Sequence, residues 1–231
     1  MKKFIWIISI ILLITLVFSC ALVGCKEKEE NHEEENERKV VVVFEPLDDA
    51  SVNDLRNIVG LFYATFMKNG ITSCSVKLVD NNKRIQLTIP DESYALKVLR
   101  WIQSPITLEI RKEGRDEELK SNPYITNNDL QSASVSTDSH GSFVVALKFN
   151  EEGTKKFEAA TAERMGKSIN FWLDGEWVMG PTVGFVISNG EATITGNYSY
   201  EEANELATRI QMGSMKVRLQ IYDMKTYPED E

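Results

Sequence analysis

The architecture is set by residues 84–110, which read RIQLTIPDESYALKVLRWIQSPITLEI. The first six residues alternate apolar and polar side chains, as a strand buried on one face does. Asp91 can then cap a helix, and apolar residues follow it at spacings of three and four. Pro105 ends the helix, and residues 106–110 alternate again. This stretch therefore predicts a strand, a helix and a second strand.

The preceding residues complete a unit of the same kind. Residues 40–44 are a β-branched run that predicts a strand, and residues 51–70 predict a helix that opens on a capping box. Residues 74–89 predict a hairpin around a polar turn. The order β-α-β-β-α-β is simplest as a ferredoxin-like base over residues 40–112.

A nearly all-polar run at residues 111–122 marks a boundary, after which a second unit begins. Residues 151–165 predict a helix in it. Period-2 strands are predicted over residues 143–149, 169–173, 177–179, 183–187 and 192–194. Ser199 opens a last helix that Gly213 closes, and residues 217–221 predict a final strand. We therefore expect the α+β class, with an α+β head subdomain inserted into the base.

The first 25 residues predict the cellular address. Lys2 and Lys3 precede an uncharged run that ends in Leu22-Val23-Gly24-Cys25. This pattern resembles the signal of a bacterial lipoprotein, which implies that residues 1–24 are a signal peptide and that Cys25 becomes the lipidated N-terminus, carrying acyl chains such as palmitate. An uncleaved transmembrane anchor is the alternative, since about 20 apolar residues can cross roughly 30 Å of hydrocarbon.

In both cases the remaining chain lies on the extracytoplasmic face of the cell membrane. Residues 25–39 predict an acidic flexible tether, because residues 26–39 hold seven glutamates, four basic residues and no large apolar side chain. Such a segment buries too little apolar surface to fold. We therefore expect the membrane, reached through the lipid anchor, to be one partner.

The composition excludes several functional classes. The chain has 231 residues, with 26 Lys and Arg against 35 Asp and Glu, and its net charge of −9 argues against nucleic acid as a partner. Three cysteines and two histidines are too few and too scattered for a disulfide framework or a Cys/His metal site. Cys74 alternates with polar residues and is expected to be buried. We expect no metal and no cofactor.

Several short motifs follow one another in the second unit. They are Leu173-Asp174-Gly175, Gly180-Pro181, Ile187-Ser188-Asn189-Gly190-Glu191-Ala192-Thr193-Ile194-Thr195-Gly196 and Tyr198-Ser199-Tyr200-Glu201-Glu202-Ala203. With the element order of residues 40–222, they resemble the first periplasmic domain of SecD, a membrane subunit of the bacterial protein-export machinery. The resemblance implies a head over residues 120–197, and a closing helix and strand of the base over residues 198–225. The transmembrane helices of SecD have no counterpart in the sequence, so we expect a stand-alone lipoprotein.

The resemblance implies a noncatalytic module that binds exported polypeptides or the Sec translocon. Exposed aromatic side chains or sheet edges of the head can hold an unfolded chain. The candidate polypeptide-binding residues are Trp172, Trp177, Met179 and Phe185. We expect Trp177, beside a turn, to protrude, whereas the alternation of residues 183–187 places Phe185 inside.

Two other functions remain open. An adaptor that binds a folded envelope protein would share all these sequence features. A cell-envelope hydrolase would need paired carboxylates, for which Asp174 with Glu176, or Glu201 with Glu202, are the candidates. Asp174 is explained by its turn, and adjacent helical residues point apart, so we expect no catalytic residue.

Overall fold

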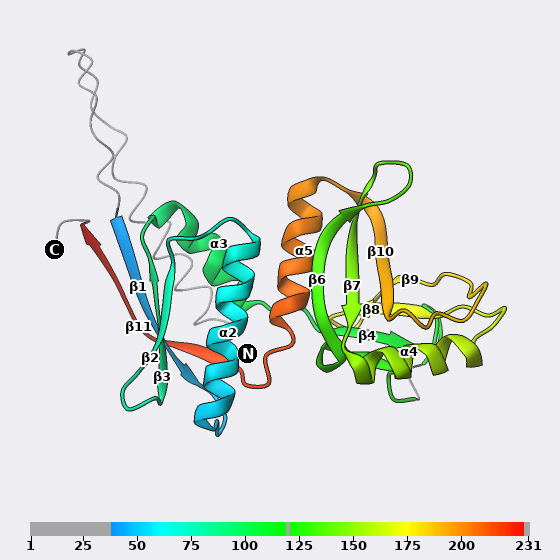
Figure 1. Ribbon diagram of the computed structural model, residues 1–231, viewed down its shortest axis with the longest axis horizontal. Helices are drawn as coiled ribbons and strands as arrows, with labels where there is room; N and C mark the ends of the chain where they lie inside the picture. Colours follow the sequence, from blue (N-terminus) through cyan, green and yellow to red (C-terminus); the bar gives the residue numbers. More distant parts are fainter. Residues whose placement is uncertain (1–37, 119–120, 229–231) are drawn as a thin grey trace, which may run out of the picture. The chain divides into compact units, whose positions relative to one another are not determined.

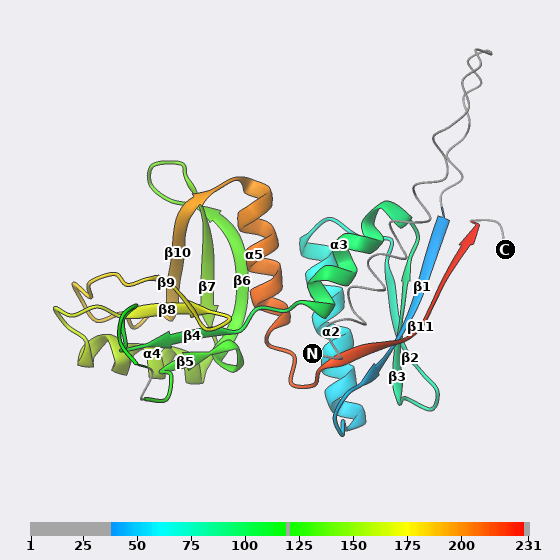
Figure 2. The same ribbon diagram turned by 180° about the vertical axis from the view of Figure 1, so that it is seen from behind.

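The computed structural model describes residues 38–118 and 121–228 (Figures 1 and 2). The predicted signal peptide, the lipidation site Cys25 and all but the last two residues of the tether lie outside the described residues. Helices combine with antiparallel sheets, which confirms the α+β class. No helix in the described part of the chain is long and apolar enough to cross a membrane.

One sheet, the base sheet, has the strand order β11-β1-β3-β2, and all neighbouring strands are antiparallel. Its strands are β1 (Arg38–Pro46), β2 (Ser75–Val79), β3 (Arg84–Ile89) and β11 (Leu219–Pro228). A hairpin joins β2 to β3, and β3 lies between β1 and β2, as in a split β-α-β unit. The base is therefore ferredoxin-like, with β11 as its fourth strand.

The helices α2 (Val52–Lys68) and α3 (Glu92–Gln103) pack their apolar stripes against the base sheet. Ser51 and Asp91 cap them by accepting hydrogen bonds from backbone N–H groups of the first turn, at 3.2 and 2.7 Å. Both predicted helices are present because these signals are local. The largest fully buried side chains of this core are Phe44, Phe62, Phe66 and Trp101.

The strand predicted at the end of the base lies in a different sheet. β4 (Leu108–Arg111) pairs with β5 (Ile125–Thr126) and β8 (Asn170–Leu173), so the predicted base of residues 40–112 is wrong at its end. Alternation fixes which side chains of a strand are buried, but not which strand it pairs with. The insertion into the base therefore begins directly after α3.

The inserted head contains two sheets, with the strand orders β10-β7-β6 and β5-β4-β8-β9. Its other elements are η1 (Asn127–Asp129), β6 (Leu130–Thr137), β7 (Phe143–Phe149), α4 (Glu151–Glu163), β9 (Glu176–Met179), β10 (Glu191–Tyr198) and α5 (Tyr200–Met212). The resemblance places α5 in the base, but Ala203, Ala207 and Ile210 are buried in the head core. The head therefore extends beyond the predicted 120–197, and of the predicted closing segment 198–225 only the strand belongs to the base sheet.

Asn127 holds the two ends of the head together. Its buried side-chain Nδ2 donates to Ile106 O and to Ile210 O, both at 2.9 Å, and its Oδ1 accepts from Leu108 N at 2.7 Å. Gly213 is required beside them, since a Cβ there would lie 2.2 Å from Ile106 O. The head is thus joined to the base through two neighbouring segments.

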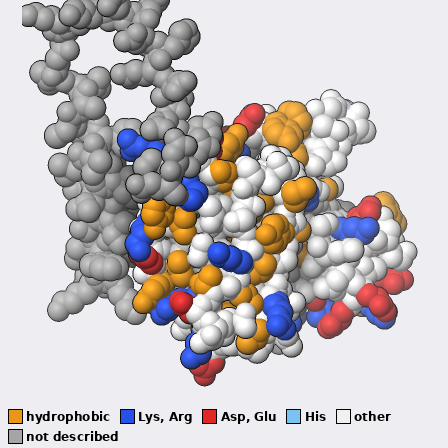
Figure 3. Space-filling view, turned by 60° about the vertical axis from the view of Figure 1, so that its left-hand side comes forward, with side chains coloured by type: hydrophobic (Ala, Val, Ile, Leu, Met, Phe, Trp, Pro, Cys, Tyr) orange, Lys and Arg blue, Asp and Glu red, His pale blue; other side chains and the backbone are white. Residues whose placement is uncertain are grey.

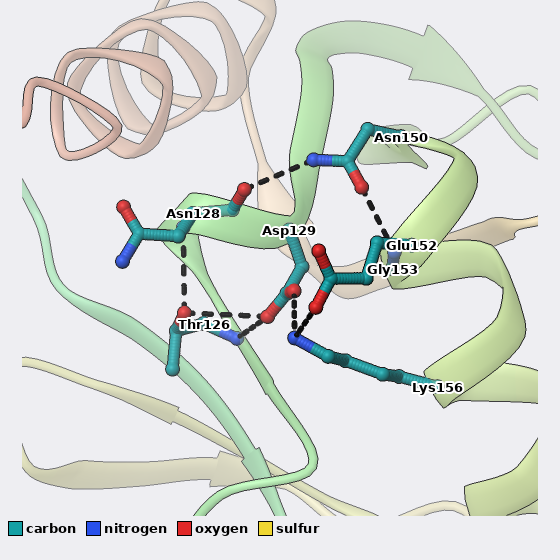
Figure 4. A network of polar contacts seen from close by, with 7 residues as sticks. All are labelled: Thr126, Asn128, Asp129, Asn150, Glu152, Gly153 and Lys156. Carbon is teal, nitrogen blue, oxygen red and sulfur yellow. Dashed lines mark hydrogen bonds and ion pairs between the residues drawn. The ribbon is translucent and has the colours of Figure 1, made fainter.

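A polar network fixes the first turn of α4 against η1 (Figure 4). Asp129, whose side chain is 7% exposed, accepts from Thr126 N at 2.9 Å and from Lys156 Nζ at 2.7 Å. Asn150 caps α4 by accepting from Gly153 N at 2.8 Å. The packing is so close that a Cβ on Gly153 would lie 2.4 Å from Asp129 O. The start of α4 therefore has little freedom to move.

Candidate functional site

The head has a pocket of about 460 Å³ beside β10. Apolar side chains from α4, β9 and the segments 169–171 and 180–187 form much of its wall. They are Phe157, Ile169, Phe171, Met179, Val183, Phe185 and Ile187. Phe157 and Phe171 belong to the buried head core. A concave, mainly apolar surface of this size is typical of a ligand site.

The segment that carries Phe185 differs from its prediction. Residues 183–187 form no strand, and the Phe185 side chain is 71% exposed rather than inside. Val183 N donates to Lys167 O at 3.0 Å, and Ile187 N donates to Thr161 Oγ1 at 3.1 Å. These contacts fix the segment on both sides of Phe185. The alternation of apolar residues in this segment therefore does not reflect pairing in a sheet.

β10 borders the pocket with a free strand edge. It pairs with β7 on one side, and no other described strand pairs with it on the other. Glu191, Thr193 and Thr195 are exposed on β10 and line the pocket together with the half-buried Ala192. Figure 1 shows β10 at the edge of its sheet, next to β7. Unpaired backbone N–H and C=O groups of this edge therefore border the pocket.

Charge is divided unevenly between base and head. Residues 105–217 hold 17 acidic and 11 basic side chains, a net charge of −6. The base segments 38–104 and 218–228 hold 8 acidic and 11 basic side chains, a net charge of +3. On the side seen in Figure 3, hydrophobic side chains are interspersed with Lys and Arg. Glu191 is the one ionisable side chain among the described residues that line the pocket.

Two of the four predicted binding residues do not line the pocket. Trp172 is buried, and its Nε1 donates to Glu113 O at 3.1 Å. Trp177 was expected to protrude but is half-buried, and its Nε1 donates to Asn170 Oδ1 at 3.0 Å. Asn170 in turn donates to Lys112 O at 3.1 Å. Both indoles therefore anchor the polar segment that follows β4.

Met179 and Phe185 are the predicted residues that do line the pocket. Phe157 and Thr161 of α4 also line it, and sequence reasoning did not single them out. They lie four residues apart, so that they share one face of the helix. That spacing indicates a buried helix face, but it does not distinguish a pocket wall from ordinary core.

The candidate carboxylates are not brought together at the pocket. Asp174 Oδ1 accepts from Thr107 N at 2.8 Å, and Asp174 and Gly175 form a turn with φ of 50° and 81°. Glu202 completes the capping box of α5, where it accepts from Ser199 N at 2.8 Å. Neither predicted pair lines the pocket, so the arrangement gives a hydrolase reading no support.

Cys74 is buried, as expected, directly before β2. Burial raises the pKa of its thiol to about 11, because the thiolate is poorly solvated there. A nucleophilic cysteine needs the opposite shift. Within the described residues, no group of three His, Cys, Asp or Glu side chains is placed to hold a metal ion.

An α+β head inserted into a ferredoxin-like base is also the architecture of the SecDF structures that this chain resembles. The family model described as SecDF, P1 head subdomain, matches residues 105–217. Residues 105–217 are therefore homologous to the P1 head subdomain of SecDF. The matched range begins directly after α3, where the insertion begins, and ends beyond α5 at Val217, which packs in the base core.

Curated relatives are protein translocase subunits SecD. The chain is 37% identical over 110 residues to that of Acidaminococcus fermentans, covering 48% of this chain and 26% of the relative. It is 29% identical over 157 residues to that of Leptotrichia buccalis, covering 68% of this chain and 38% of the relative. The chain thus spans well under half the length of these relatives.

Solved structures agree on the fold. A SecDF structure, described as that of a membrane component that enhances protein export, matches 80% of this chain and 99% of its own at a TM-score of 0.64 and 26% identity. SecDF in its super-membrane-facing form matches 85% of this chain and 32% of its own at a TM-score of 0.67 and 25% identity.

Proposed function

We propose that the protein is an extracytoplasmic accessory of protein export that holds unfolded polypeptide in the head pocket. The observation that carries the proposal is the pocket itself. It combines an apolar wall with the exposed ring of Phe185, and Phe185 has no visible role in the fold because it is 71% exposed. Exposed apolar surface next to a concave site is typical of a surface that binds another chain.

The similarity to protein-export subunits supports the same proposed function. The matched proteins are translocase subunits by name, and the head is the region where the family match lies. The proposed partners are therefore exported polypeptides or the Sec translocon. Binding rather than turnover is the proposed mechanism, and no step in it needs a cofactor.

Anchoring at the membrane is the second part of the proposal. Cleavage before Cys25 would leave a lipid-modified cysteine, and the tether of residues 25–39 would carry the base above the extracytoplasmic membrane face. Replacing Cys25 by Ala should abolish labelling with a palmitate analogue. An uncleaved anchor would instead leave the wild-type protein unlabelled and still in the membrane fraction.

The binding test uses the full-length protein and a reduced, carboxymethylated polypeptide that cannot fold. Phe185→Ser should weaken binding about tenfold, because covering an exposed Phe side chain on binding contributes about 1.5 kcal/mol. Leu96→Ser is the matched control, since Leu96 is 65% exposed on α3 and lies outside the pocket. Equal binding by both variants and the wild type would refute the proposal.

A photoreactive residue at position 185 extends the test to cells, with position 96 as the control. Capture of translocon subunits or newly exported chains at 185, but not at 96, is the expected result. Capture of one folded envelope protein in their place would instead favour the adaptor function.

A further inference from the structure

We propose that the free edge of β10 takes up an extended polypeptide segment as an added strand, and that Glu191 favours segments in which a Lys or Arg lies near an apolar residue. The inference rests on the proposed function, and it specifies how the pocket holds a chain and which chains it prefers. The occupant is thus an extended, cationic and apolar segment of polypeptide.

The first support is the geometry of the strand. β10 pairs with β7 from Glu191 to Ile194, each residue facing one on β7, and again at Tyr198. Its other side meets no strand among the described residues. Backbone groups on such an edge can pair with a partner chain of any sequence, so the edge supplies affinity without side-chain selectivity.

The second support is the alternation of side chains. Glu191, Thr193 and Thr195 lie on one face of β10, because successive side chains of a strand point to opposite faces. All three line the pocket. A strand added alongside would place its own residues opposite them at intervals of two. Peptide residues two and four positions from a basic residue opposite Glu191 would lie opposite Thr193 and Thr195. The Thr195 hydroxyl lies 3.9 Å from the sulfur of Met179, which belongs to the apolar wall.

The third support is charge. The Glu191 carboxylate is exposed and accepts a hydrogen bond from Asn189 Nδ2 at 3.2 Å. Lys148 lies opposite on β7, but no ion pair joins the two side chains in the described part of the chain. The net charge of −6 over residues 105–217 adds a longer-range attraction for cationic segments.

A charge on an edge strand can also serve to prevent pairing with other chains. The two roles predict different effects of neutralising Glu191 on peptide affinity. If Glu191 protects the edge, its neutralisation strengthens the binding of every peptide. If Glu191 selects a cation, its neutralisation weakens the binding of basic peptides and leaves that of neutral peptides unchanged.

The test measures fluorescence anisotropy of eleven-residue, unstructured peptides with the full-length protein. The peptides share a central Leu and carry Lys, Gln or Glu two residues away. Affinity should fall in the order Lys, Gln, Glu. Glu191→Gln should weaken binding of the Lys peptide two- to fivefold, as expected for an exposed ion pair, and should bring the affinities of the Lys and Gln peptides closer together. Glu201→Gln, an exposed acid of the same head outside the pocket, should change nothing.

Backbone pairing is tested separately with N-methylated peptides. Alternate amides of an added strand face β10, so methylating one alternate set should abolish binding and methylating the other set should leave it intact. Equal binding of both sets would overturn strand addition. Equal binding of the Lys, Gln and Glu peptides would overturn the role of Glu191, while leaving the proposed function standing. If no peptide binds the wild-type protein, the proposed function itself fails.

Discussion

Replacing Gly153 by Ala should destabilise the protein, although the same change normally favours a helix. In an open helix interior, Gly→Ala stabilises by about 1 kcal/mol. At Gly153 the new Cβ would lie 2.4 Å from Asp129 O, 2.8 Å from Asp129 Cβ and 3.1 Å from Phe149 Cβ. None of these atoms is the end of a flexible side chain, so the helix or η1 must shift.

Overpacking of this kind costs about 1–3 kcal/mol or more, which exceeds the helical gain. We expect a net loss of about 1–2 kcal/mol in the free energy of unfolding. Gly60→Ala is the matched control, because Gly60 lies within α2 and a Cβ there would meet nothing within 4 Å. That variant should gain about 0.5–1 kcal/mol.

Urea unfolding of the full-length variants, followed by Trp fluorescence, measures both changes. The slope of the free energy of unfolding against urea concentration must be the same in all variants, which shows that the same transition is being compared. A Gly153→Ala protein as stable as Gly60→Ala would show that α4 can move away from η1. It would refute the close packing described for this helix start.

Three further predictions concern single side chains. Between pH 8 and 10.5, the free energy of unfolding should fall by about 2 kcal/mol more in the wild type than in Cys74→Ala. The pKa of about 11 keeps the Cys74 thiol protonated in the folded protein after the thiol of the unfolded chain, with its ordinary pKa near 9, has ionised. Urea unfolding under reducing conditions measures the difference. Lys156→Met should lower the free energy of unfolding by about 1–2 kcal/mol, because the buried Asp129 carboxylate loses its cation. Lys155→Met removes only an exposed ion pair and should cost under about 0.5 kcal/mol. Equal losses in thermal unfolding would contradict this difference. Trp172→Phe removes the hydrogen bond to Glu113 O and should speed tryptic cleavage after Arg115 several-fold, and an unchanged cleavage rate would count against that anchor.

The elements that the sequence predicted well are those with local signals. Ser51, Asp91 and Ser199 each cap a helix through hydrogen bonds within its first turn, so a few neighbouring residues carry the information. Strand pairing is different. β4 alternates as predicted, yet its partners begin 14 and 59 residues after its last residue, Arg111, and no local pattern distinguishes them from β1.

The pocket was less predictable than the fold. Trp172 and Trp177 drew notice because large aromatic residues often bind partners, but their indole N–H groups are used by backbone and amide oxygens of the head. Phe185 was expected inside because it alternates with Val183. In the structure Val183 forms only an isolated bridge, to Met165, and the ring beyond it is free to face solvent.

The junction at Asn127 bears on the order in which the chain can fold. β1 pairs with β11 from Arg38 opposite Pro228 to Pro46 opposite Leu219, so the base sheet closes only after the last strand has been synthesised. While the head is unfolded, the link from the end of α3 to β11 is a loop of about 115 residues. Once Asn127 has joined Ile106 to Ile210, the link from the end of α3 to β11 behaves as a loop of about 10 residues, which lowers the entropic cost of adding β11 to the rest of the base by about 2 kcal/mol. The head would then act as a folding template for the domain that encloses it in sequence.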